Sequence, residues 1–159
     1  MTKKAEVIEP PRRERLQTPV FDANALERAT RAMEAVSPAF LEWMQADVEK
    51  LHVARLAAET DGWSDATLTA LFAAAHDVKG MGATYGFPLA TQLAACLCRL
   101  IETDAGKAAA RQLPQLVCAH VDAIRATLRD GITSSAHPVG RALVQTLEQQ
   151  VAALCVAPE

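Results

Sequence analysis

A histidine followed by a lysine and three glycines is the part of this sequence whose residue types and spacing are most suited to chemistry. His76 lies in the otherwise apolar, helix-forming run AAAHDVKGMGATYGF. The residues that follow it include Lys79, Gly80, Gly82 and Gly86. Each interior glycine costs a helix roughly 1 kcal/mol relative to alanine. Because helix stability does not account for these glycines, we interpret the run as a candidate functional site.

The chemistry that suits His76 is reversible phosphorylation of a ring nitrogen. An exposed imidazole is largely neutral at cytoplasmic pH, and its unprotonated nitrogen is a nucleophile. The Lys79 ammonium, three residues on, can approach the oxygens of a phosphoryl group and offset their charge. Gly80, one turn beyond His76 on the same face, leaves room for the backbone of a second protein.

Other roles for His76 have less support from the spacing. A metal site is not expected, because no usual zinc ligand stands three or four residues away. Those positions are held by Phe72, Ala73, Lys79 and Gly80. No serine or cysteine stands where His76 would activate it as a base. An exposed helical histidine is often an ordinary solvated residue, and its neighbours alone do not exclude that alternative.

A helical wheel over residues 65–85 separates His76 from the expected core by about 120°. The core arc holds Leu68, Leu71, Ala75, Val78, Gly82 and Tyr85. The arc around His76 holds Thr69, Phe72, Ala73, Lys79, Gly80 and Ala83. Most members of the second arc are small, so a partner protein can contact this surface closely. Phe72 is either packing at the edge of the core or part of that contact.

Polar residues outside this helix have two interpretations each. Gln92 and Arg99 share a face of the next expected helix and can lie beside the His76 surface. There they either orient the ring and contact the phosphate or are simply solvated. The other three histidines are far apart in the sequence and are interpreted as structural: His52, His120 and His137. His120 falls beside the apolar stripe of its helix, so we expect partial burial with a hydrogen bond.

The composition of the 159 residues predicts a one-domain, all-α protein. Half of the residues are apolar, aromatics make up 4%, and helix-favouring residues are abundant. The net charge of -3 gives no general attraction to nucleic acid or anionic lipid. The sequence has no signal-peptide pattern and no apolar run long enough to cross a bilayer. We therefore expect a soluble, cytoplasmic protein with no nucleic-acid or membrane partner.

The four cysteines follow neither a metal-binding nor a disulfide pattern. Cys96 and Cys98 point about 200° apart on a helix and cannot bind one metal ion. We interpret all four as small apolar residues in a reducing compartment: Cys96, Cys98, Cys118 and Cys155.

Apolar spacing and capping residues divide the chain into a tail and six helices. Residues 1–20 mix charges with prolines and are expected to be a flexible tail. A first helix is expected from the cap residue Asp22 to residue 36, and Ser37 with Pro38 opens a second that ends at residue 60. Further helices are expected over 64–86 and 88–103. Another should lie mainly after Pro114 and end at Gly131, and a last one should cover 138–156. Residues 104–106 are expected to be a loop.

Short connections between these helices favour an antiparallel four-helix bundle with additional N-terminal and C-terminal helices. The helical bundle domain is expected over residues 21–157. Its bundle core covers about 38–131, and the extra C-terminal helix covers about 138–156.

The run from His76 to Gly82 resembles the signature of histidine-containing phosphotransfer (HPt) domains. That motif has histidine, lysine and glycine at the third and fourth following positions, a small residue at the sixth and glycine at the tenth, and all five match here. The resemblance continues on the next helix at Leu89, Leu93, Leu97 and Glu102, and it spans roughly residues 22–130. Asp77 and Met81 depart from the uncharged or small residues that are frequent in the family, which leaves the choice of partner open.

The resemblance implies a phosphorelay carrier. His76 would accept a phosphoryl group from an aspartyl phosphate on one receiver domain and pass it to the aspartate of another. The implied partners are response regulator receiver domains and a hybrid histidine kinase, and Mg²⁺ is expected on the receiver. The chain itself would bind no cofactor and would have no ATP-dependent kinase activity, and we expect a monomer.

Two rival functions stay open at this stage. One is a helical adaptor that binds a receiver or a kinase through the same surface without being phosphorylated. The other is an enzyme that uses His76 as a general base, which needs a concave pocket with further polar groups.

Overall fold

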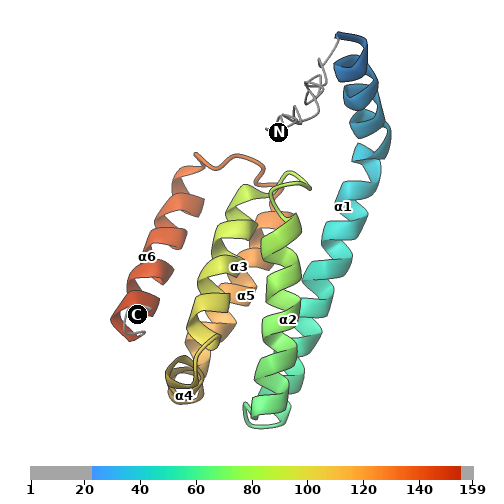
Figure 1. The fold of residues 1–159 in the computed structure, drawn as a ribbon. Coiled ribbons are helices and arrows are strands. Elements are labelled where there is room, and N and C mark those ends of the chain that lie inside the picture. The colour runs from blue at the N-terminus through green and yellow to red at the C-terminus, as the bar shows by residue number, and fades with distance from the viewer. Residues whose placement is uncertain (1–22, 155–159) are drawn as a thin grey trace, which may run out of the picture.

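All regular secondary structure in residues 23–154, the part of the chain that the computed structural model describes, is helical (Figure 1). The helices are α1 (Ala23–Thr60), α2 (Asp65–Met81), α3 (Pro88–Ile101), α4 (Asp104–Gln112), α5 (Pro114–Arg129) and α6 (Pro138–Leu154). The all-α prediction is confirmed. The expected tail over residues 1–20, the Asp22 cap, Cys155 and the end of the last expected helix lie outside the described residues.

The C-terminal part of α1 forms an antiparallel four-helix bundle with α2, α3 and α5 (Figure 1). Around the bundle, α1 contacts α2 and α5, and α3 contacts the same two helices. The short helix α4 joins α3 to α5 at one end, and α6 packs along the outside of α3. The predicted bundle with an added C-terminal helix is therefore confirmed.

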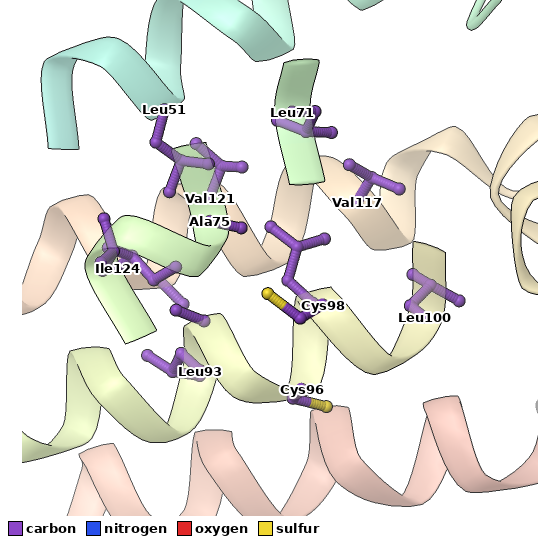
Figure 2. Packing of buried hydrophobic residues seen from close by; sticks show 14 of the residues in the cluster. Leu51, Leu71, Ala75, Leu93, Cys96, Cys98, Leu100, Val117, Val121 and Ile124 are labelled. Carbon is purple, nitrogen blue, oxygen red and sulfur yellow. The ribbon is translucent and has the colours of Figure 1, made fainter. Parts of the chain in front are cut away.

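Helix α3 is the most enclosed of the described helices, because it has the most buried residues; it contacts α2, α4, α5 and α6. Nine of its residues are buried. Figure 2 shows Cys96 on the side of α3 next to α6, whereas Cys98 lies on the side towards the bundle interior. Both cysteines are buried, as small apolar residues would be, and Cys118 is half-buried. Among the described helices, none combines the length and the apolar character needed to cross a membrane.

The predicted break at Ser37-Pro38 is wrong, because α1 is one helix with Pro38 inside it. An interior proline leaves a carbonyl of the preceding turn without its N–H partner and costs about 3 kcal/mol. The helix nevertheless continues, because residues 23–37 contain no glycine and solvent can hydrogen-bond the free carbonyl on this exposed segment.

The predicted loop over residues 104–106 is also wrong, because α4 begins at Asp104. The Thr103 hydroxyl caps the helix by accepting a hydrogen bond from the Gly106 amide at 3.0 Å. A Cβ on Gly106 would lie only 2.0 Å from the Leu100 carbonyl oxygen, so this glycine permits a close approach of α4 to α3. Glycine here serves packing and does not mark a loop.

Helix α2 begins as predicted and ends earlier than predicted. The Ser64 hydroxyl caps its start by accepting from the Thr67 amide at 3.3 Å. The helix ends at Met81, and turns follow up to Gly86. Gly86 has φ +94°, a conformation that glycine adopts without strain, and the chain then enters α3 through Pro88.

Candidate functional site

His76 lies on the exposed side of α2, as the helical wheel predicts. Leu68, Leu71, Ala75 and Val78 on the opposite side of the helix are fully buried in the bundle core. His76 itself is exposed, and so are Thr69, Ala73, Lys79, Gly80 and Ala83 on its face. The regular spacing of the buried residues thus fixes the direction in which the imidazole points.

The His76 ring is positioned by Phe72, one turn earlier on α2. The two ring centroids are 6.1 Å apart, with an interplanar angle of 31°. Phe72 is half-buried and packs against the core, so it supports the imidazole from a fixed position. Within the described residues, neither nitrogen of His76 makes a hydrogen bond, and the residue is exposed.

Lys79 is exposed on the side of α2 that faces α3. Its position is evident from its effect on Cys98: burial raises the pKa of this thiol to about 11, and the Lys79 ammonium opposes the rise. The charge of the Glu102 carboxylate also raises the pKa of Cys98. The thiol is therefore protonated and a poor nucleophile. In the described part of the chain the Lys79 ammonium has no ion pair, so its charge is available to an added anion.

Asp77 lies on the other flank of His76, towards α1. The pKa of Lys50 on α1 is raised, mainly by a 3.0 Å hydrogen bond to Asp47 and in part by the charge of Asp77. The face around His76 thus has a cation towards α3 and an anion towards α1. A phosphoryl group on the ring would be attracted towards the α3 side.

Two glycines after His76 have different surroundings. A Cβ added to Gly80 would meet no atom within 4 Å, so this position is open space one turn beyond the imidazole. A Cβ on the buried Gly82 would lie 2.7 Å from the Thr91 hydroxyl oxygen. That hydroxyl accepts a hydrogen bond from the Ala83 amide at 2.7 Å and so joins the end of α2 to α3. Thr91 could not be predicted from the sequence, because no local pattern marks a contact between these helices.

A small cavity adjoins the site beside Phe72. Its volume is about 130 Å³, and it is lined by Thr69, Phe72, Ile101, Glu102 and Lys107. The hydroxyl of Thr69 is engaged with the Asp65 carbonyl oxygen at 2.8 Å. Lys107 was missed as a site residue because its segment was expected to be close to a loop, whereas α4 brings it to α2.

The remaining predicted site residues lie on α3. Gln92 and Arg99 are both exposed, as a shared face predicts. Arg99 also lines a shallow hollow with residues of α6, among them Gln145, Glu148 and Gln149. Their proposed contact with the ring or the phosphate stays a prediction.

The other histidines have local structural contacts. His120 is completely buried, and its Nδ1 hydrogen-bonds the Leu116 carbonyl oxygen at 2.7 Å. His52 Nδ1 lies 3.2 Å from an Arg55 nitrogen, and His137 Nδ1 accepts from the Gly140 amide at 3.2 Å. Among residues 23–154, no group of three or more His, Cys, Asp or Glu side chains is placed to hold a metal ion.

Comparison with known families agrees with this geometry. A family model described as Hpt domain matches residues 36–155. The chain belongs to the Hpt domain family. HPt domains are phosphocarriers that act with receiver domains and kinases, so this chain has a phosphotransfer role in signalling. The match includes α6, which the sequence resemblance left out. It begins at residue 36, so it leaves out the first part of α1. Searches of curated proteins and of solved structures gave no match.

Proposed function

We propose that His76 is the phosphoacceptor of this HPt domain and carries a phosphoryl group between two receiver domains. The observation that supports this most is the exposed imidazole on Phe72, with no hydrogen bond to its nitrogens within the described residues. Lys79 and the open position at Gly80 lie on the same face. No other described histidine combines exposure with a neighbouring cation that lacks an ion pair.

The transfer step forms one bond as it breaks another. A lone pair on a His76 ring nitrogen attacks the phosphorus of the receiver's aspartyl phosphate, the N–P bond forms, and the P–O bond to the aspartate breaks. The aspartate leaves as a carboxylate, and the reverse reaction on a second receiver regenerates the imidazole. Lys79 offsets the charge of the phosphoryl oxygens, and Gly80 admits the receiver backbone. In this proposal Mg²⁺ is supplied by the receiver, and this chain binds no cofactor.

The test uses receiver domains carrying radiolabelled phosphate. We expect label to pass to this protein in a form that is acid-labile and alkali-stable, as a phosphorus–nitrogen bond requires. His76→Gln should remove the label, whereas the matched variant His52→Gln should retain it. If His76→Gln is labelled like the wild type, the assignment is wrong. Binding of receivers with no label on the wild-type protein would favour the adaptor instead.

A further inference from the structure

The first part of α1, residues 23–37, extends past the ends of the other helices, and we refer to it as the arm (Figure 1). The family match begins at residue 36, so nearly all of the arm is an addition to the HPt bundle. Large apolar side chains on it are exposed: Leu26 by 65%, Met33 by 52% and Val36 by 41%. Apolar exposure of this extent along one helix indicates an interaction surface.

The apolar residues of the arm have the spacing of a helix that packs against another helix. Leu26, Met33 and Phe40 are seven residues apart, and the residue three positions after each is also uncharged and apolar. These six residues occupy the a and d positions of a heptad repeat: Leu26, Ala29, Met33, Val36, Phe40 and Trp43. Two and a half repeats of this pattern give a continuous stripe about 27 Å long.

Charge is confined to the other side of the arm. Its four charged residues all fall at outer heptad positions: Glu27, Arg28, Arg31 and Glu34. Two of them already pair with each other, since the Arg31 guanidinium lies 3.6 Å from the Glu27 carboxylate. The positions that flank the stripe are small and uncharged: Thr30, Ala32, Ser37 and Ala39. A second helix can therefore approach closely without burying a charge.

We propose that the arm pairs with the arm of a second copy of this chain, in antiparallel orientation. A twofold axis between residues 34 and 35 would place Met33 against Val36 of the second copy and Ala29 against Phe40 of the second copy. In the second contact, the Phe40 ring already packs against Tyr85 of α2, at 5.5 Å between centroids, and against Trp43, at 5.9 Å. Because only part of the ring surface is left to a partner, a small residue such as alanine suits the position across the axis. A parallel pair would instead oppose two Phe40 rings and crowd both bundles at one end.

The interface is of the size expected for a weak dimer. The exposed stripe would lose roughly 500 Å² per copy, about 1,000 Å² in total, which is below the size of stable interfaces and in the range of weak ones. The two copies should therefore associate reversibly with protein concentration. This proposal concerns the arm and does not depend on phosphorylation of His76, so either can fail without the other.

Sedimentation velocity of the full chain under reducing conditions tests the dimer, over roughly a hundredfold range of protein concentration. We expect a shift from monomer to dimer as the concentration rises. Met33→Asp should stay monomeric throughout, because the new charge would be buried in the stripe. Ala35→Asp places the same charge two residues away on the outer side and should dimerise like the wild type. Circular dichroism of both variants checks that helix content is unchanged.

Two results would overturn the proposal. One is a wild-type protein that stays monomeric over the whole range, which would leave the arm to a different protein or to residues 1–22. The other is equal dimerisation of Met33→Asp and Ala35→Asp, which would place the dimer contact on another surface.

Discussion

The Phe72 ring lies one helical turn before the His76 ring, with 6.1 Å between their centroids and 31° between their planes. Phe72 belongs to the core on one side and to the exposed face on the other. It therefore connects the rigid interior of the bundle to the side chain that we propose as the phosphoacceptor. Positioning of this kind is effective because a small displacement of a reacting group lowers its rate.

Phe72→Leu should slow phosphotransfer to His76 while leaving the fold intact. Leucine keeps apolar bulk against the core but removes the aromatic contact, which is worth about 0.5–1.5 kcal/mol and so about two- to tenfold in rate. The measurement is the rate of labelling at saturating receiver, together with the urea midpoint. Equal rates for Phe72→Leu and the wild type would show that the ring contact does not position His76.

Lys79→Gln should lower the rate of phosphotransfer by about tenfold or more, because a charge-assisted hydrogen bond to the phosphoryl oxygens contributes about 1.5–3 kcal/mol. Its effect on folding should be small, since Lys79 is exposed and makes no ion pair within residues 23–154. Lys50→Gln on α1 is the matched control and should transfer at the wild-type rate. An equal loss of phosphotransfer rate in both variants would show that positive charge attracts the receiver in general and that Lys79 has no specific role.

Gly80→Leu should weaken receiver binding without destabilising the protein. A Cβ at this position meets no atom, and a helix gains stability when glycine is replaced. The added side chain would occupy the space that the receiver backbone needs. Isothermal titration with a receiver measures the affinity, and thermal unfolding measures the stability. If Gly80→Leu binds as tightly as the wild type, the receiver does not approach at this point.

Gly82→Ala should have the opposite effects, because it should lower the stability of the protein and leave receiver binding unchanged. The new methyl group would lie 2.7 Å from the Thr91 hydroxyl oxygen and 3.2 Å from its amide nitrogen, so α2 and α3 must move apart. Overpacking of this kind lowers the free energy of unfolding by about 1–3 kcal/mol. Urea denaturation measures the loss. A fully stable variant would mean that the end of α2 can shift freely against α3.

His120 should make stability depend on pH. Burial lowers the pKa of His120 from its ordinary value of 6.5, and its Nε2 has no hydrogen-bond partner. The folded state therefore holds the neutral ring, whereas the unfolded state takes up a proton below about pH 6.5. The stabilisation is present above that pH and is lost as the pH falls towards the lowered folded pKa, by up to about 1.4 kcal/mol per pH unit.

Unfolding of the wild type and of His120→Leu, compared between pH 7.5 and pH 5.5, tests this dependence. The variant should lose less stability across this interval than the wild type. The Glu59 and Asp130 carboxylates, whose pKa values are lowered by their partners, act at more acidic pH and do not interfere. Parallel curves for the two proteins would show that another group is responsible.

The sequence predicted the orientation of His76 because helical periodicity alone determines it. Leu68, Leu71, Ala75 and Val78 recur at the spacing of one helix face, so the opposite face had to be exposed. The Ser64 cap and the turn at Gly86 could also be predicted from the sequence, since each depends on one residue and its immediate neighbours.

Features that depend on contacts between helices were not predictable in this way. The course of α1 was missed for a local reason instead, because Pro38 favours a helix start and yet α1 runs through it. Gly106 has the composition of a loop, yet it lies where α4 touches the Leu100 carbonyl oxygen. The joining of α2 to α3 by Thr91 and the approach of Lys107 to Phe72 likewise arise only once the helices are packed.

The enclosure of α3 between the bundle and α6 determines what a partner meets at the His76 face. We expect the backbone amides of so enclosed a helix to exchange with solvent only when the whole domain opens, whereas an exposed helix end opens locally. Helix α2 is joined to α3 at its C-terminal end, where the Ala83 amide donates to the Thr91 hydroxyl. A receiver that binds over His76 therefore meets a surface already ordered, and its binding free energy is not spent on restricting the motion of this domain.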